Sequence, residues 1–388
     1  MAWSNVIGQD RVKQILRNAI LNGKVAHAYL FYGPEGVGKD AMAIEFAKAL
    51  NCERNKGEAC DECKTCRGIG ELSHPNVKLI FKLPLGKNET KDDSPIEKLD
   101  ESEIKLIQEQ VRLKAQNPYH KITIPRANSI KINSIREIKM EVSHSLLIPG
   151  WRVIIVSEAD AMTEQAANAF LKTLEEPSPK TVIILTTANK DKLLPTIISR
   201  CQLVRFSYLS DDEIANALIE RYELTPARAR LIARLANGSF GKAIELLDVT
   251  VKDKRIKPID FLATIASGKI VKMLIEIEKI VTDYERSEIE NFLHIILTWF
   301  RDALMLKIGL EDKIINVDMV ERLRKFIASY GEIDYQKAIA LVERAISQVE
   351  KNLQLNLILI NLSIDLFDLM SEAYVKTKQT GKVQWTGK

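Results

Sequence analysis

The sequence predicts an α/β domain built around a phosphate-binding P-loop, with an inserted zinc knuckle, followed by segments that are helical throughout. Three observations predict this class: a Gly-rich loop between an apolar run and a helical pattern, four closely spaced cysteines, and helical periodicity in the last third of the chain. The chain has 388 residues, more than one compact core usually holds, so we expect two or three domains.

The composition is that of an ordinary globular protein, with 46% hydrophobic and 28% charged residues. The net charge of +4 predicts by itself neither a nucleic-acid nor an acidic partner. The first residues lack the basic start and apolar core of a signal peptide. The most apolar stretch, 353–370, is interrupted by Asn356, Asn361, Asp365 and Asp368, so we expect a buried helix and no membrane span. A cytoplasmic protein without a membrane partner is therefore expected.

A Gly-rich loop with the sequence GPEGVGKD begins at Gly33 and follows the strand predicted over 28–32. Its G-x4-G-K spacing, between a strand and a helix, is typical of a P-loop. We expect the backbone N–H groups around Gly36 and Gly38 to surround an anion, and Lys39 to reach the terminal phosphates of a nucleotide. The alternative is an ordinary Gly-rich turn before a helix, which does not require this full spacing.

Two positions depart from the pattern of an ATP-hydrolysing P-loop protein. Asp40 stands where Ser or Thr holds Mg²⁺. A carboxylate can ligate a hard cation, but at ~4 Å from a phosphate its charge costs roughly 1 to 4 kcal/mol. The strand predicted over 151–156 is followed by Ser157 in place of the metal-binding Asp, while Glu158 remains to polarise the attacking water. We therefore expect ATP and Mg²⁺ to bind weakly or not at all.

Four cysteines, Cys52, Cys60, Cys63 and Cys66, lie within fifteen residues. This spacing predicts a closed, tetrahedral zinc site with four thiolate ligands, and a cytosolic setting argues against disulfides. An iron–sulfur cluster is the alternative, because four thiolates also hold such clusters. We expect the metal to stabilise a loop-rich insert and to take no part in catalysis. The fifth cysteine, Cys201, is expected to be a buried packing residue.

The segment 82–130 is crowded with Lys, Asp and Glu between 87 and 105, so we expect an exposed insert with a short amphipathic helix. A partner-binding insert is the alternative. Asn189 follows the strand predicted over 181–187, where a P-loop ATPase places the residue that senses the γ-phosphate. Arg200 ends a short helix and would present its guanidinium beyond the sheet edge. A basic run over 252–257 is expected to be a solvated linker, with a DNA contact as the alternative.

In this order, the residues resemble one family: the AAA+ subunits of the bacterial replicative clamp loader, part of the DNA polymerase III holoenzyme. The resemblance covers residues 1–207 and is carried by the loop at 33–40, the four-cysteine insert at 52–66, and the motifs at 157–160, 168–177 and 195–201. Its most specific part is Ser199-Arg200-Cys201, which looks like an arginine finger donated in trans to ATP on a neighbouring subunit. The resemblance further implies a helical lid over 208–250, a helical collar over 255–375 through which subunits assemble, and a tail at 376–388.

In the resemblance, Gly241 stands where an ATP-hydrolysing member carries an Arg. Asp40, Ser157 and Gly241 thus depart where a subunit handles its own ATP, whereas Arg200 is retained. This pattern resembles the delta-prime type of subunit, a stator. It implies a pentameric ring with gamma/tau and delta subunits that opens the sliding clamp and sets it on primer-template DNA. The alternative is a gamma/tau-like motor that hydrolyses ATP, in which Asp40 ligates Mg²⁺ and Glu158 acts as the base.

Overall fold

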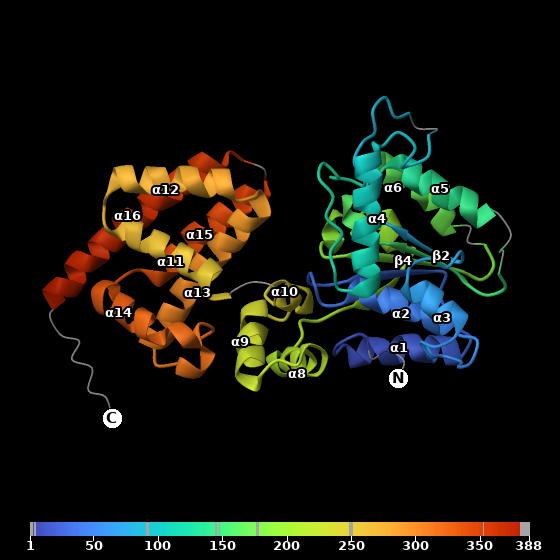
Figure 1. Ribbon diagram of the computed structural model, residues 1–388, viewed down its shortest axis with the longest axis horizontal. Helices are drawn as coiled ribbons and strands as arrows, with labels where there is room; N and C mark the ends of the chain where they lie inside the picture. Colours follow the sequence, from blue (N-terminus) through green and yellow to red (C-terminus); the bar gives the residue numbers. More distant parts are fainter. Residues whose placement is uncertain are drawn as a thin grey trace. The chain divides into compact units, whose positions relative to one another are not determined.

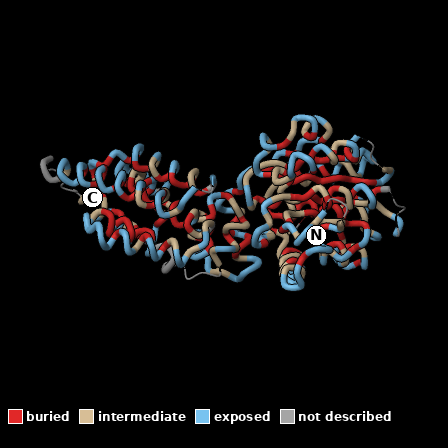
Figure 2. Tube along the Cα trace, turned by 90° about the horizontal axis from the view of Figure 1, so that it is seen from above, coloured by how far each residue is buried: buried red, intermediate tan, exposed pale blue. Residues whose placement is uncertain are grey.

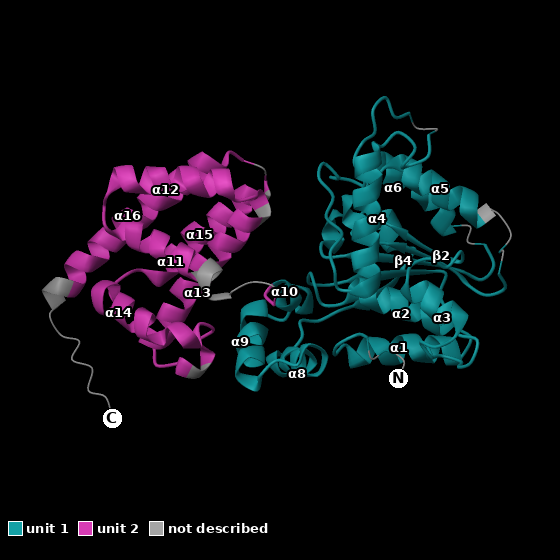
Figure 3. Cartoon of the chain, viewed as in Figure 1, with its two compact units in different colours: residues 1–245 teal, residues 246–388 magenta. Residues whose placement is uncertain are grey.

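The computed structural model describes residues 3, 5–90, 93–143, 146, 148–175, 178–247, 251–351 and 353–380. The chain divides into two compact units, residues 1–245 and residues 246–388 (Figure 3). Glu176 and Pro177 of the family-like motif, and 381–388 of the predicted tail, lie outside the described residues.

The first unit contains a sheet of five parallel strands in the order β2-β3-β4-β1-β5. The strands are β1 (Ala28–Tyr32), β2 (Val77–Ile80), β3 (Arg152–Val156), β4 (Thr181–Thr187) and β5 (Gln202–Arg205). The apolar runs predicted to be strands form β1 to β4, and β4 is buried along its whole length. Figure 2 shows the buried residues gathered at the centre of this unit. The sequence did not reveal β5, because in this edge strand only Val204 is buried.

Helices cover both faces of this sheet: Figure 1 shows α1, α2 and α3 on one face and α5 and α6 on the other. The helices of this unit are α1 (Asp10–Leu21), α2 (Lys39–Asn51), α3 (Lys64–Gly70), α4 (Glu101–Gln116), α5 (Ile132–Ser143), α6 (Glu164–Glu175), α7 (Pro195–Ile198), α8 (Asp211–Tyr222), α9 (Pro226–Ala236) and α10 (Phe240–Glu245). The helices α8 to α10 correspond to the segment expected to form a lid, and they belong to the same compact unit as the sheet.

The segment 82–130 is more ordered than a solvated insert. Its helix α4 is longer than the short pattern predicted, and it helps to form a small apolar cluster of Leu83, Leu99, Ile107 and Ile124. Lys131, just after this segment, and Glu89 within it form an ion pair at 2.7 Å with side chains only 4% and 5% exposed. Lys131 Nζ also donates hydrogen bonds to the carbonyl oxygens of Pro84 and Pro95. The many charged residues in the sequence indicated an exposed loop. This prediction missed the buried ion pair, because the sequence does not reveal which charged side chains are paired and buried.

Every described element of the second unit is helical, around one apolar core that includes Phe261, Leu293 and Leu366. Its α-helices are α11 (Val251–Ala266), α12 (Ile270–Asp283), α13 (Arg286–Lys307), α14 (Val320–Tyr330), α15 (Tyr335–Glu350) and α16 (Leu355–Thr380). The predicted linker over 252–257 is wrong, because α11 already begins at Val251. Helix α16 passes the expected start of the tail at 376. Within the part of the chain that the structure describes, no helix is both long and apolar enough to span a bilayer.

Candidate functional site

The carboxyl ends of three neighbouring parallel strands bring the predicted nucleotide residues together. The Gly-rich loop follows β1, Ser157 and Glu158 follow β3, and Asn189 follows β4. Because β3, β4 and β1 are adjacent and parallel, their ends share one edge of the sheet, which is where ligands bind in open α/β folds. The structure therefore brings these residues, which the sequence predicted for one nucleotide site, to the same edge of the sheet.

The Gly-rich loop has the backbone of a P-loop. Gly36 and Gly38 adopt φ values of 71° and 96°, in the left-handed region that favours glycine, and Gly38 directly precedes α2. Lys39 Nζ donates hydrogen bonds to the carbonyl oxygens of Gly33 at 2.7 Å and Pro34 at 2.5 Å. Burial lowers the pKa of Lys39, and nearby carboxylates only partly offset this effect. The lysine predicted to reach phosphates is thus held by its own loop.

Asp40 is the most tightly held carboxylate of the site. Its oxygens accept hydrogen bonds from Lys114 Nζ at 2.7 Å, Ser157 Oγ at 2.7 Å and Thr186 Oγ1 at 2.6 Å. Burial by itself raises the pKa of Asp40, but the Lys114 ammonium and the three hydrogen bonds outweigh it and lower the pKa to about 2. The sequence indicated that Ser157 replaces a lost metal ligand. In the structure, Ser157 helps to hold Asp40, the other residue that departs from the P-loop pattern.

Glu158 is also paired with lysines. It lies on the turn after β3 with a φ of 53°, and its carboxylate forms ion pairs with Lys82 at 2.9 Å and Lys121 at 3.5 Å. Lys121 forms a second ion pair with Glu35 of the Gly-rich loop. Burial lowers the pKa of Lys121, but the two carboxylates raise it overall. The sequence missed Lys82, Lys114 and Lys121 as site residues, because all three lie in the segment taken for a solvated insert.

Asn189 is exposed at the end of β4 and is oriented by a neighbouring acid. Its Nδ2 donates to Asp160 Oδ2 at 3.4 Å, and its backbone N–H donates to Thr187 Oγ1 at 2.9 Å. Asn189 lines a cavity of about 630 Å³ together with Gly33 and Pro34. The predicted sensor residue and the start of the P-loop therefore share one cavity wall.

The helical segment 208–245 and the residues after α4 lie directly on the P-loop. The backbone N–H of Gly241 donates to Gly36 O at 3.0 Å. A Cβ at Gly241 would lie 3.1 Å from Gly36 Cα, so a larger residue here would require the loop to shift by a few tenths of an ångström. The ring of Tyr119 packs against Phe240 with centroids 4.9 Å apart, and a Cβ at Gly38 would lie 2.9 Å from the Tyr119 hydroxyl. The missing Arg at 241 thus coincides with a close contact between lid and loop.

Arg200 lies just after α7, and its side chain is 34% exposed. Its Nε donates to Glu175 Oε1 at 3.0 Å and its Nη1 donates to Thr196 O at 2.8 Å. The guanidinium therefore lies at the surface, where another molecule can contact it, and not inside a packed core. Both the acid and the carbonyl that hold it belong to this chain, so a trans contact requires Arg200 to exchange Glu175 for a phosphate.

The four predicted metal ligands, Cys52, Cys60, Cys63 and Cys66, come together in the structure. Any two of their sulfur atoms lie within 4.8 Å, close to the separation of about 3.8 Å that a tetrahedral zinc site with Zn–S bonds of about 2.3 Å requires. The backbone N–H of Cys63 donates to the sulfur of Cys60 at 3.3 Å. This hydrogen bond, with weaker ones from neighbouring groups, lowers the pKa of Cys60 to about 6. The donor set and its geometry fit zinc. Burial raises the pKa of Cys201 to about 12, in keeping with a packing role.

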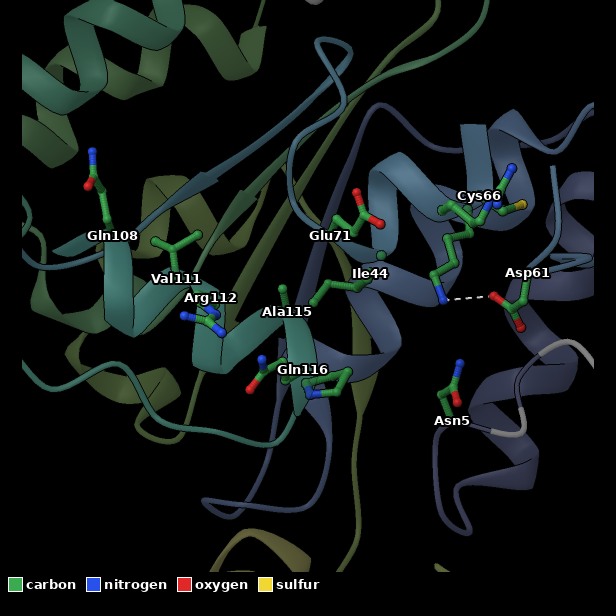
Figure 4. A pocket seen from close by; sticks show the side chains of 14 residues that line it. Asn5, Ile44, Asp61, Cys66, Glu71, Gln108, Val111, Arg112, Ala115 and Gln116 are labelled. Atoms are coloured by element: carbon green, nitrogen blue, oxygen red, sulfur yellow. Dashed lines mark hydrogen bonds and ion pairs between the residues drawn. The ribbon is translucent and has the colours of Figure 1, made fainter. Parts of the chain in front are cut away.

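A second cavity, of about 760 Å³, lies between α2, the four-cysteine segment and α4. Figure 4 shows Val111 and Arg112 of α4 on one side of it and Asp61 and Cys66 on the other. The dashed line marks the ion pair at 2.8 Å between Lys48 Nζ and Asp61, so this buried lysine is already neutralised. The residues that line this cavity include none of the Gly-rich loop, and it is separate from the predicted nucleotide site.

One known protein family matches the part of the chain that contains this site. The family described as DNA polymerase III, delta subunit, matches residues 8–210, which include the Gly-rich loop, the four cysteines and Arg200. The chain belongs to this family. The resemblance read from the sequence motifs is thereby confirmed.

Several known proteins are similar to this chain over part or most of its length. The chain is 29% identical to the DNA polymerase III subunit delta′ of Bacillus subtilis, over 89% of this chain and 92% of that protein. It is 33% identical to the delta′ subunit of Pseudomonas aeruginosa over 45% of this chain and 42% of that protein. The tau subunit of Bacillus subtilis is 28% identical over 83% of this chain and 54% of its own length. Among solved structures, a DNA polymerase III gamma subunit-related protein of Thermotoga maritima is 17% identical, with a TM-score of 0.42, covering 93% of this chain and 99% of that one.

Proposed function

We propose that this chain is a delta-prime-like stator of the DNA polymerase III clamp loader, which does not hydrolyse ATP and supplies Arg200 in trans to ATP on a neighbouring subunit. One observation carries the proposal: Asp40 is held by the buried Lys114, whereas Arg200 is held at the surface, by a partly exposed acid and a backbone carbonyl oxygen. A buried ion pair resists exchange, and a surface pair exchanges readily. The subunit would thus be inert at its own AAA+ loop and available at its neighbour's.

The alternative is a gamma/tau-like motor subunit, and the contacts of its two essential carboxylates argue against it. Such a subunit needs Asp40 free to ligate Mg²⁺ and Glu158 free to act on the attacking water. Asp40 is instead bonded to an ammonium and two hydroxyls, and Glu158 is paired with two lysines. Both would have to lose these partners before each turnover.

The same proposal names the partners and the metal. The relatives are delta′ and tau subunits of DNA polymerase III, which supports other subunits of that assembly, gamma/tau and delta, as neighbours. The proposal places them in a pentameric ring that acts on the sliding clamp and primer-template DNA. The helical second unit would serve as the collar of that ring. Zinc in the four-thiolate site would stabilise the segment between α2 and β2, because a closed thiolate site contributes to folding and leaves no position for a substrate.

ATP hydrolysis by the reconstituted clamp loader tests the proposal. An arginine finger contributes on the order of 10³- to 10⁵-fold in rate, so Arg200→Ala should nearly silence the one ATP site that it serves and leave the other sites active. Arg228→Ala, an exposed arginine of α9, is the matched control and should leave the rate unchanged. An unchanged rate with Arg200→Ala removes Arg200 from the proposed role. Hydrolysis by the isolated chain that Lys39→Ala abolishes would favour the motor.

A further inference from the structure

We propose that Lys114 is the resident cation of the P-loop, and that residues 114–121 form a built-in plug that closes the loop to Mg²⁺ and nucleotide. The inference concerns the isolated chain and does not depend on the trans role of Arg200.

The first step is the position of the Lys114 ammonium. In a P-loop ATPase, the residue after the loop lysine and an acid at the end of a second parallel strand hold a divalent metal. Here those two positions are Asp40 and Ser157, and the Ser157 hydroxyl donates a hydrogen bond to the Asp40 carboxylate. The negative charge of Asp40 is balanced by the Lys114 ammonium, with Nζ 2.7 Å from the carboxylate. A second hydrogen bond, to His120 O at 2.8 Å, fixes the ammonium. A metal ion at Asp40 would have to displace it.

The second step is burial. The Lys114 side chain is only 4% exposed and that of Asp40 is 17% exposed, so water screens this pair poorly. A divalent ion brought beside a buried ammonium would meet strong repulsion, because two like charges interact far more strongly here than in bulk water. The pair is therefore both stable against exchange and a barrier to Mg²⁺.

The third step is the side chain that covers the loop. The Tyr119 hydroxyl accepts a hydrogen bond from the backbone N–H of Ile7 at 2.8 Å, and the residue is 8% exposed. Its ring lies between the N-terminal segment, Gly38 of the loop and Phe240 of α10. Tyr119 thus fills space beside the P-loop and ties it to the helical segment that follows the sheet.

The fourth step is charge balance. Four acidic residues act on the loop lysine Lys39, and three of them are paired with lysines from 82–121: Asp40 with Lys114, Glu158 with Lys82 and Lys121, and Glu35 with Lys121. The fourth, Asp160, accepts hydrogen bonds from Thr187 and Asn189. A nucleotide with its metal normally supplies the balancing charges at such a site. In this chain they are supplied internally, so the first unit should need neither for its stability.

Thermal unfolding of the full chain tests the proposal, with and without Mg·ATP. Wild type should show no rise in Tm with Mg·ATP. Lys114→Met and Asp40→Thr should each lower the Tm by roughly 6 to 20 °C, because each leaves a buried polar or charged partner unmatched. The double variant Asp40→Thr/Lys114→Met should recover most of that loss and should gain a rise in Tm with Mg·ATP. Lys105→Met is the control in the same helix, since its ion pair with Glu101 is 72% and 82% exposed.

Two results of this experiment would overturn the plug. One is a Tm rise with Mg·ATP in wild type as large as that of the double variant. The other is a double variant whose loss equals the sum of the single losses, since uncoupled losses mean that the two side chains do not depend on each other. The plug rests on the part of the proposed function in which the chain's own loop is inactive, so ATP hydrolysis by the isolated chain would overturn both. The Arg200 test uses the assembled loader, so the trans role can fail while the plug stands, and a Tm rise of wild type with Mg·ATP can overturn the plug while the trans role stands.

Discussion

Replacing Glu175 should release Arg200 toward a neighbouring subunit. Glu175 is the last residue of α6, and its Oε1 accepts hydrogen bonds from both Nε and Nη2 of Arg200. Glu175→Gln keeps the shape of the side chain and removes its charge. A negative charge at a helix C-terminus is unfavourable, so the substitution should not destabilise α6. What changes is the interaction free energy between Arg200 and residue 175, which is lost when Arg200 moves to contact a phosphate.

The size of this effect follows from exposure. Arg200 is 34% exposed and Glu175 is 49% exposed, so water screens the pair and its net contribution is about 0 to 1 kcal/mol. A barrier lower by about 1 kcal/mol corresponds to a rate about five times higher. Glu175→Gln should therefore raise ATP hydrolysis at the site that Arg200 serves by a factor between one and about five, with the larger effect at low salt.

The assay is ATP turnover by the reconstituted loader at two salt concentrations. Glu164→Gln is the matched control, because Glu164 lies at the other end of the same helix and is exposed. A rate that falls to the level of Arg200→Ala would refute the reasoning, since Glu175 would then work with Arg200 and not restrain it. Arg200→Ala combined with Glu175→Gln should be as slow as Arg200→Ala alone.

Two further predictions concern the metal and the buried acid. The purified chain should carry about one zinc ion, and the Cys63→Ser variant should lose this ion and have a lower Tm. The control variant Cys201→Ala should keep the zinc ion. Metal analysis that finds iron, or no metal at all, would exclude a zinc site. The pKa of Asp40 is about 2 in the folded chain against an ordinary 3.8, so its charge contributes about 2 kcal/mol above pH 4, which is lost as the pH falls toward 2. The Tm difference between wild type and Asp40→Asn should narrow over that range, and a constant difference would contradict the pKa shift.

The P-loop and its flanking elements could be predicted because their signals are local. A buried strand at 28–32, glycines at 36 and 38 and a helix after Lys39 each have a short signature, and parallel pairing then brings the strand ends together. The edge strand β5 has only one buried side chain and therefore no such signature. The cysteine cluster was readable for the same reason, since four ligands lie within one short segment.

The partner of Asp40 could not be read from local pattern alone, because it lies 74 residues away. A signal was nevertheless present. Ile104, Ile107, Val111 and Lys114 follow one another at helical spacing, so Lys114 continues the apolar stripe of α4. A lysine in an apolar stripe is buried with a partner or points out along the surface. Only the three-dimensional contact decides between these, and here the partner is a second misfit residue, Asp40.

The difference between the two charged contacts explains how one chain could be inert and yet govern ATP use. Breaking the buried Asp40–Lys114 pair costs about 3 to 5 kcal/mol, whereas giving up the surface pair of Arg200 costs about 1 kcal/mol or less. A phosphate offered by a neighbour can therefore recruit Arg200, but a nucleotide offered to the chain's own loop first has to displace Lys114 from Asp40, at the higher of these two costs. If the proposed function holds, the chain's response to ATP would depend on Arg200 meeting the nucleotide of a neighbouring subunit, and not on nucleotide binding to its own P-loop.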